Sequence, residues 1–178
     1  MKGILFKPEM IQQIINGSKS VTRRVIKPQP IVAENYKGIT IEDLEFDGFK
    51  PHYHVGEVVY VKEAWCESYY GEPICYKLDG GESPSPKGFW RSPLFMPARA
   101  ARYFIQITDA KPQRLQEVTT NSCKLEGISD SAMGNAIQEG YPAIKAFADL
   151  WDSINPRYPW ESNPWVFVYS FKLVEKEV

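Results

Sequence analysis

Gly17-Ser18-Lys19-Ser20-Val21-Thr22-Arg23-Arg24 marks the point in the chain where a helix pattern gives way to an extended one. On an extended stretch Thr22 and Arg24 point the same way, because alternate residues of a strand share a face. Lys19 is expected in the preceding turn, where its side chain can converge on them. A lysine, a hydroxyl and a guanidinium around one point could grip a phosphate or polarise a carbonyl. An exposed basic turn is the plainer interpretation of the same spacing.

The segment before this stretch predicts a short amphipathic helix. Its apolar residues recur at spacings of three and four, at Met10, Ile11, Ile14 and Ile15. Pro8 suits the first turn of a helix, and Gly17 suits the position just after its end. We therefore expect a helix over Pro8–Asn16 that stops abruptly before the basic stretch.

The rest of the chain predicts strands with short helices between them. β-branched, aromatic or alternating runs indicate strands over residues 56–65, 100–108 and 165–173, with 74–78 as a candidate partner of the first. Spacings of three and four indicate helices over 129–139 and 142–154. There is no βαβ rhythm, so the fold class is expected to be α+β, a small mixed β-barrel with flanking short helices. No linker divides the chain, and we expect a single domain over 1–178.

Composition is that of an ordinary soluble globular protein. Apolar residues make up 43% and charged residues 24% of 178 residues, and no run approaches the ~18 apolar residues of a membrane span. The N-terminal apolar run is too short, and the segment around it too charged, for a secretory signal. The three cysteines are Cys66, Cys75 and Cys123, an odd number without a CxxC, which favours free thiols in a reducing cytoplasm. His52 and His54 lack a suitably spaced acidic or cysteine partner, so no metal or other cofactor is expected.

The net charge of -1 conceals a segregation of charges along the chain. Basic residues dominate 1–27 and 87–114, whereas acidic residues gather in 42–82 and 115–161. If the fold brings the two basic segments together, they form a face suited to phosphate. The alternative is charge scattered over a solvated surface, and the sequence leaves both open.

These motifs resemble those of ASCH domains. That family shows a short helix followed by G-x-K-x-x-T-x-R, then a G-[DE]-x-[VIL] strand and a late E-G. The corresponding stretches here are 17–24, Gly56-Glu57-Val58-Val59 and Leu125-Glu126-Gly127-Ile128. The chain is also similar to the longer ASCH proteins encoded by phages and prophages, over residues 22–28, 62–65, 92–97, 114–118, 150–155 and 163–166.

The resemblance implies a PUA-like β-barrel and a partner that is RNA or a nucleoside, with no membrane association. One small bacterial relative is an amidohydrolase that deacetylates N4-acetylcytidine with a lysine, a threonine and a glutamate. By motif these correspond to Lys19, Thr22 and Glu126 of this chain. Another relative resembles a ribonuclease, and PUA-like domains generally bind RNA. Three functions therefore stay open, a metal-free amidohydrolase, a ribonuclease and a non-catalytic RNA-binding module, and so does the oligomeric state.

The implied trio is chemically workable for amide hydrolysis. A desolvated lysine beside the cation Arg24 would have a lowered pKa and could act as base or nucleophile. Glu126 could pass the proton to the leaving amine, and Thr22 could orient water or donate to the developing oxyanion. Glu63 is a second candidate acid that shares a strand face with Trp65. An inward carboxylate needs a partner, and Arg24 is the expected one.

Relative to the small amidohydrolase, residues 28–54 and 66–97 look like long loop insertions. The second contains Phe89-Trp90-Arg91 and Phe95-Met96-Pro97-Ala98-Arg99, and aromatics interleaved with basic residues suit a nucleic-acid strand. Burial of Trp90 and Phe95 under a long loop is the competing and slightly favoured interpretation. The expected substrate-binding residues are Arg23, Arg24, Glu63, Trp65 and Arg99.

Overall fold

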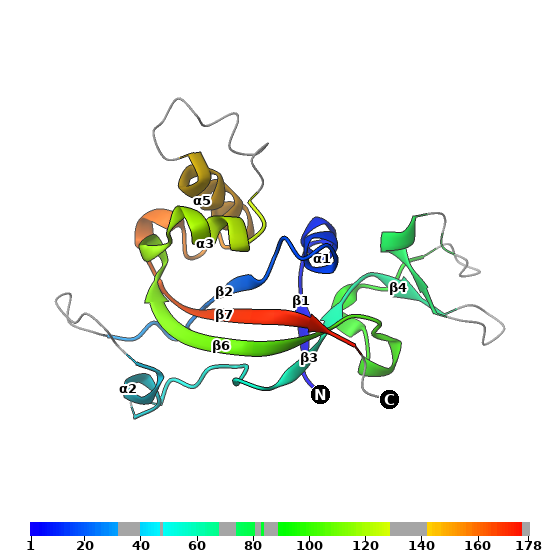
Figure 1. The fold of residues 1–178 in the computed structure, drawn as a ribbon, viewed down its shortest axis with the longest axis horizontal. Helices are drawn as coiled ribbons and strands as arrows, with labels where there is room; N and C mark the ends of the chain where they lie inside the picture. The colour runs from blue at the N-terminus through cyan, green and yellow to red at the C-terminus, as the bar shows by residue number, and fades with distance from the viewer. Residues whose placement is uncertain are drawn as a thin grey trace. The chain divides into compact units, whose positions relative to one another are not determined.

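The computed structural model describes residues 1–31, 40–46, 48–67, 74–80, 83, 89–128 and 142–175. Its main feature is a mixed five-stranded sheet in the order β1-β3-β6-β7-β2 (Figure 1). The strands are β1 (Gly3–Leu5), β2 (Val21–Val25), β3 (Val58–Lys62), β6 (Phe104–Arg114) and β7 (Trp165–Val174). A second, two-stranded sheet pairs β4 (Trp65–Cys66) with β5 (Cys75–Tyr76). The α+β class predicted from the sequence is confirmed.

The helices are short and lie between the strands in the chain. They are α1 (Pro8–Ile15), α2 (Ile41–Phe46), α3 (Thr120–Leu125) and α5 (Pro142–Ile154). Single 3-10 turns occur at η1 (Lys77–Asp79), η2 (Pro93–Phe95), η3 (Ala98–Ala100), η4 (Leu115–Glu117) and η6 (Trp160–Ser162). None of the helices in the described ranges has the length and hydropathy to cross a membrane. The helix expected over 129–139 lies outside the described residues.

Contacts divide the chain into two compact units. The first comprises Met1–Gly17, Glu57–Gln106 and Lys172–Val178, and the second comprises Ser18–Gly56 and Ile107–Phe171. Each unit has its own core of buried residues, and the single domain expected over 1–178 stays a prediction.

Helix α1 of the first unit forms as its sequence predicts. Pro8 occupies its first turn, Ile11 and Ile14 are buried, and the helix ends at Ile15. Gly17 follows with a φ of 80°, the left-handed conformation that glycine adopts without steric cost. The predicted helix, over Pro8–Asn16, therefore differs from the observed one by a single residue.

The strand predicted over 56–65 is divided in two. β3 ends at Lys62, and β4 begins at Trp65 and pairs with β5 instead of continuing in the large sheet. Between them Glu63 is buried and donates its backbone N–H to Met96 Sδ at 3.2 Å. The prediction that residues 74–78 pair with this region is confirmed by the β4–β5 ribbon.

The core of the second unit is built on β7. Sequence alternation predicted one apolar face over 165–173, yet every residue of Trp165–Tyr169 is buried. Val166 and Val168 belong to a core shared with α3 and α5, which Figure 1 shows together on one side of the strands. On the other face the Tyr169 ring meets the Tyr53 ring edge-on, with centroids 5.3 Å apart. Both faces of β7 are buried, so its residues do not alternate between apolar and polar, and the sequence pattern could not reveal the second buried face.

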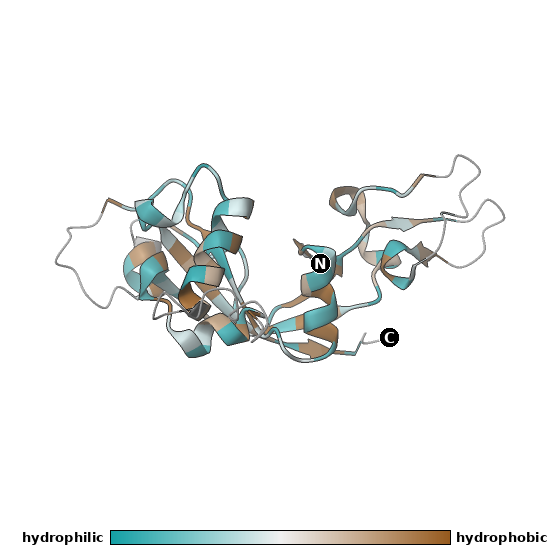
Figure 2. Ribbon diagram, turned by 90° about the horizontal axis from the view of Figure 1, so that it is seen from above, coloured by the Kyte–Doolittle hydropathy of each residue, from teal (hydrophilic) through white to brown (hydrophobic). Residues whose placement is uncertain are grey.

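Helix α5 spans the predicted residues 142–154. Ala143, Phe147 and Trp151 are buried in the shared core, whereas Ile154, predicted to continue the apolar stripe, is 43% exposed because the helix ends there. Figure 2 shows apolar and polar residues alternating along the helices of this unit, as expected for helices with one buried face. The strand predicted over 100–108 begins later, at Phe104, and continues to Arg114.

Gly17→Ala should destabilise the protein by about 1 to 2 kcal/mol, because alanine pays a steric cost at positive φ. No neighbouring atom lies within 4 Å of a Cβ added at Gly17, so the cost comes from the backbone alone. Gly17→Asn is the matched control, since asparagine tolerates this conformation better and should lose about half as much. Urea denaturation measures both, and equal losses would contradict a backbone origin.

Candidate functional site

Glu126 is positioned by the short helix α3. Thr119 caps the helix start, its Oγ1 accepting the Ser122 backbone N–H at 3.2 Å. Gly127, with a φ of 92°, turns the chain out of the helix immediately after Glu126. Sequence analysis did not predict α3, although a threonine three residues before Ser122 and a glycine after Glu126 are typical end markers.

Lys19 meets Glu126 at the beginning of β2. The two residues form an isolated antiparallel β-bridge, and Lys19 Nζ donates to Glu126 Oε2 at 2.7 Å and to its backbone oxygen at 2.8 Å. Lys19 is 2% exposed and Glu126 is 6% exposed. The pair is therefore a buried, charge-assisted hydrogen bond between residues that are 107 positions apart in the chain.

Arg23 is the second cation on the same carboxylate. Its Nη1 donates to Glu126 Oε1 at 2.9 Å, and its Nη2 donates to Ser122 Oγ at 2.7 Å. The guanidinium carbon lies 5.5 Å from the centre of the Phe147 ring. Arg23 is 5% exposed, and among the described residues its Nε has no hydrogen-bond partner. We call Lys19, Arg23 and Glu126 the Glu126 cluster.

Thr22 and Arg24 lie on the opposite face of β2 from Arg23, because side chains alternate along a strand. Arg24 Nη1 donates to Thr22 Oγ1 at 2.6 Å and to the Arg23 carbonyl oxygen at 3.0 Å. The predicted convergence of Thr22 and Arg24 is thus observed as a direct contact. Lys19 and Arg23 both bind the Glu126 carboxylate on the other face, and the Arg24 charge also acts on Lys19 and Glu126.

The Arg23 carbonyl points away from the sheet interior. Ser20 accepts from the Phe171 N–H at 2.8 Å, and the Ile26 N–H donates to Trp165 at 3.0 Å, so the even-numbered positions bond to β7. In an antiparallel ladder the intervening residues then face the other way. Since β2 is the last of the described strands in the order, Arg24 folds back onto its outer edge.

The Glu126 cluster holds more positive than negative charge. Two cations share one carboxylate, and Arg24 adds a third positive charge nearby. Burial lowers the pKa of the Lys19 ammonium from its ordinary value, although the Glu126 carboxylate opposes the shift, and Arg24 and Arg23 lower it further. A buried lysine under these influences is easier to deprotonate than a surface lysine.

Three predicted substrate-binding residues, Glu63, Trp65 and Arg99, belong to the first unit and are not in the Glu126 cluster. Glu63 is 2% exposed, and its two carboxylate oxygens accept from Arg102 Nε at 2.8 Å and Nη2 at 2.9 Å. The prediction that Arg24 pairs with Glu63 is wrong. Arg102 was missed because it comes from the segment before β6, and its alignment with Glu63 depends on pairing of β6 with β3.

The aromatic and basic residues of the 66–97 region have mixed exposure. Trp65 is buried, and the Arg91 guanidinium lies 4.8 Å from its ring centre. Arg99 pairs with Glu67, which also forms an ion pair with Arg91. Phe95 is 75% exposed and Trp90 is partly exposed, so the expected burial of Phe95 is wrong. The 3-10 turn η2 leaves Phe95 outside the core, while the adjacent Met96 is buried.

Within the described part of the chain, no group of three or more His, Cys, Asp and Glu side chains is arranged to hold a metal ion. The polar groups that the structure brings together are therefore cations, one carboxylate, hydroxyls and an amide. Such a set can bind an anion or a carbonyl oxygen and can move a proton between Lys19 and Glu126.

No protein-family model matches the sequence, and a search of curated proteins finds no match. The solved structures that are similar to this chain include the following two. Protein EF3133 from Enterococcus faecalis, of the family DUF984, has a TM-score of 0.46 and 11% identity, covering 98% of this chain and 82% of that one. An ASCH domain from Lactobacillus crispatus has a TM-score of 0.40 and 14% identity, covering 94% of this chain and 71% of that one. Neither likeness, at these values, assigns a family or a function.

Glu126→Gln should destabilise the protein by about 3 to 5 kcal/mol, because it leaves two buried cations without a counter-charge. Lys19→Met should cost at least about 2 kcal/mol less, because it leaves Arg23 and Glu126 as a neutral pair. Denaturant unfolding of the two variants measures the difference. A larger loss for Lys19→Met would show that the surplus cation stabilises the fold.

Cys123 should give the protein a specific loss of stability in alkali. Burial raises the pKa of its thiol from 9.0 to about 11. Between these values the unfolded chain loses the proton first, so stability falls as pH rises from about 9 to about 11, by on the order of 2 to 3 kcal/mol. Comparing denaturation midpoints of wild type and Cys123→Ala across this range tests it: the variant should lose this part of the slope, and identical slopes would refute the assignment.

Proposed function

We propose that this chain binds RNA or a modified pyrimidine nucleoside at the Glu126 cluster together with Thr22 and Arg24, and that it hydrolyses an N-acyl group of the N4-acetylcytidine kind without a metal. One observation carries the proposal. A buried lysine with a lowered pKa is hydrogen-bonded at 2.7 Å to a buried carboxylate. The motif resemblance of the 17–24 and 125–128 stretches supports the choice of an acylated cytidine.

The Lys19–Glu126 pair can supply the proton transfers. With Lys19 in its neutral form, its amine accepts a proton from the water that attacks the acyl carbonyl carbon. The carbon–nitrogen bond then breaks, and the leaving exocyclic amine of the base needs a proton. Lys19 Nζ passes the proton that it took from water along its hydrogen bond to Glu126 Oε2. The Glu126 carboxyl group then delivers this proton to the leaving amine. The products are the free nucleoside and a carboxylic acid.

Thr22 and Arg24 lie on the other face of β2 from Arg23, but the Arg24 charge acts on both Lys19 and Glu126, so the Thr22–Arg24 pair can stabilise the oxyanion. The Thr22 oxygen already accepts from Arg24 Nη1, so the hydroxyl hydrogen remains available to donate to the substrate carbonyl oxygen. Arg24 polarises that hydroxyl and adds positive charge where negative charge develops. Preorganised donors of this kind typically contribute a factor of about 100 to 1,000 to the rate.

The surplus of positive charge also supports a second candidate. Lys19, Arg23 and Arg24 against one carboxylate suit an RNA phosphate. A ribonuclease would use these cations to stabilise the negative charge that develops on the phosphodiester that it cleaves. A non-catalytic module would use them for affinity alone, and binding would weaken steeply with added salt.

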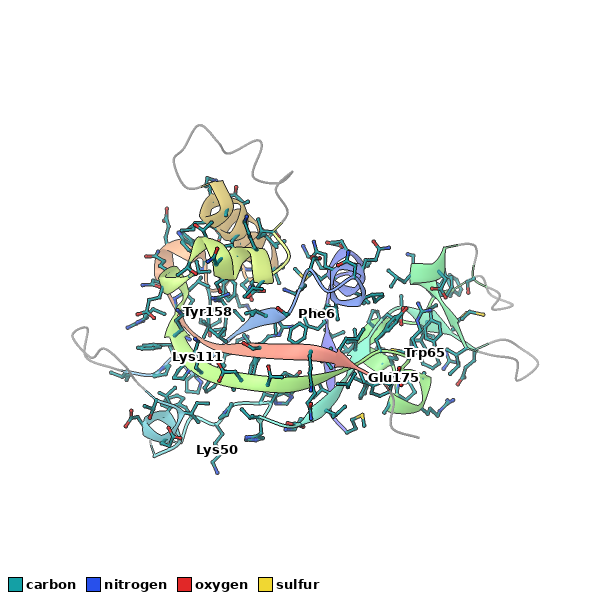
Figure 3. The ribbon with its side chains drawn as sticks, viewed as in Figure 1. Phe6, Lys50, Trp65, Lys111, Tyr158 and Glu175 are labelled. Atoms are coloured by element: carbon teal, nitrogen blue, oxygen red, sulfur yellow. The ribbon has the colours of Figure 1, made fainter. Side chains whose placement is uncertain are left out.

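Release of cytidine from N4-acetylcytidine, followed by chromatography with a chelator present, tests the proposal. Wild type should release cytidine, and Lys19→Met should lose at least about 100-fold in turnover. Lys111→Ala is the matched control, because Lys111 is an exposed lysine of β6 (Figure 3) and should leave turnover unchanged.

If wild type fails to release cytidine even at high enzyme concentration, the amidohydrolase proposal is wrong. Wild type and Lys19→Met would then be compared for binding and cleavage of a labelled RNA at two salt concentrations. Strand products lost in the variant would favour the ribonuclease, and salt-sensitive binding without products would favour the non-catalytic module.

A further inference from the structure

Two cysteines of the first unit face each other across the β4–β5 ribbon. Cys66 of β4 is paired in register with Cys75 of β5, and the ladder continues through the Lys77 N–H, which donates to the Ala64 oxygen at 2.9 Å. Directly opposed residues on antiparallel strands have Cα atoms about 4.5 to 5.5 Å apart and share a face of the ribbon. The Lys77–Ala64 hydrogen bond makes Cys66 and Cys75 a hydrogen-bonded pair, for which the Cα separation is about 5.5 Å, within the roughly 4.4 to 6.8 Å that a disulfide needs.

The two thiols already interact. The Cys66 thiol lies close enough to the Cys75 thiol to act on its pKa, and neither sulfur is in a disulfide. Cys66 is buried, whereas Cys75 is partly exposed. Burial raises the pKa of the Cys75 thiol, and Cys66 raises it further, as expected for two thiols that cannot both ionise easily. The remaining cysteine, Cys123, is buried in the core of the second unit.

We infer that Cys66 and Cys75 form a reversible disulfide, with a small-molecule disulfide such as oxidised glutathione as the oxidant. The partly exposed Cys75 thiolate attacks one sulfur of the oxidant, forms a mixed disulfide and releases one thiolate. Cys66, after losing its proton, then attacks the Cys75 sulfur and expels the second thiolate. Two protein thiols are oxidised and one molecule of the small disulfide is reduced to two thiols. This site is independent of the proposed function.

The bond would secure residues that organise the first unit. Next to Cys66 is Trp65, labelled in Figure 3, whose buried ring carries the Arg91 guanidinium. Next to Cys75 is Tyr76, whose hydroxyl donates to the Ala100 oxygen at 2.8 Å. A ribbon of only two residue pairs has little hydrogen bonding of its own, so a covalent link between its strands should raise the thermal midpoint of unfolding.

The experiment treats the reduced full-length chain with oxidised glutathione, alkylates the remaining thiols and identifies cross-linked peptides by mass spectrometry. The expected product is a monomer joined between Cys66 and Cys75, with Cys123 alkylated, and formation should accelerate as pH rises because the Cys75 thiolate is the attacking group. Cys123→Ser should form the same link. Cys66→Ser should stop at glutathione bound to Cys75. The oxidised wild type should unfold at a higher temperature than the reduced form.

Three results would overturn the inference: a wild-type Cys75 that stays in the mixed disulfide, a link that includes Cys123 or joins two chains, or a Cys66–Cys75 link that forms only in denaturant. Dithiothreitol should return the thermal midpoint of the oxidised protein to the reduced value. The Cys75→Ser variant, which lacks the attacking thiol, should show no midpoint difference between the two treatments, which separates the effect of the bond from that of the substitution.

Discussion

The carboxylate of Glu126 is the constraint around which the second unit is organised. One oxygen accepts from Lys19 and the other from Arg23, so a single side chain at the end of α3 fixes the start and the middle of β2. The partners are separated by 107 and 103 positions in the chain. Such contacts form only after the strands and helices have assembled, and Ser122 and Phe147 then complete the surroundings of Arg23.

This arrangement is poor as a device for stability alone. A fold that needed only a buried ion pair would balance its charges, whereas here two cations share one anion under a low dielectric. In natural proteins such unbalanced buried charge is found mainly at functional sites. The excess charge would be relieved by a bound anion or by loss of a proton from Lys19, and both outcomes are useful chemically.

Local patterns predicted the elements that depend on local physics. Helix α1 follows from apolar spacing with Pro8 and Gly17 at its ends, and α5 follows from the same periodicity up to Asn155-Pro156. Helix α3 has only six residues, too few for a period, and was missed. Glu63 was correctly expected to be buried, but its partner depends on which strands pair, and the sequence offered no means to choose Arg102 over Arg24.

The same distinction applies within the site. The residue types of the Glu126 cluster were predicted from the motifs, but not its geometry. Lys19 was expected in a turn beside Thr22, and instead it forms a β-bridge in phase with Arg23. A shift of one residue in where extended structure begins changes the face on which a side chain lies. Spacing along the chain therefore predicted the residues, and strand phase decided which of them meet.

Among the described strands β2 is the last of the sheet, and its outer edge has a consequence for how two molecules of the protein behave toward each other. An unpaired strand edge is a template for a strand of another chain, and folded proteins protect such edges with charge. Here the Arg24 guanidinium donates a hydrogen bond to the outward-facing carbonyl oxygen of Arg23. Further along the same edge, Lys19 forms a β-bridge with Glu126. An incoming strand would have to displace a bound cation and break that bridge before it could add to the sheet. The residues proposed to recognise a ligand thus also guard the protein against aggregation through this edge.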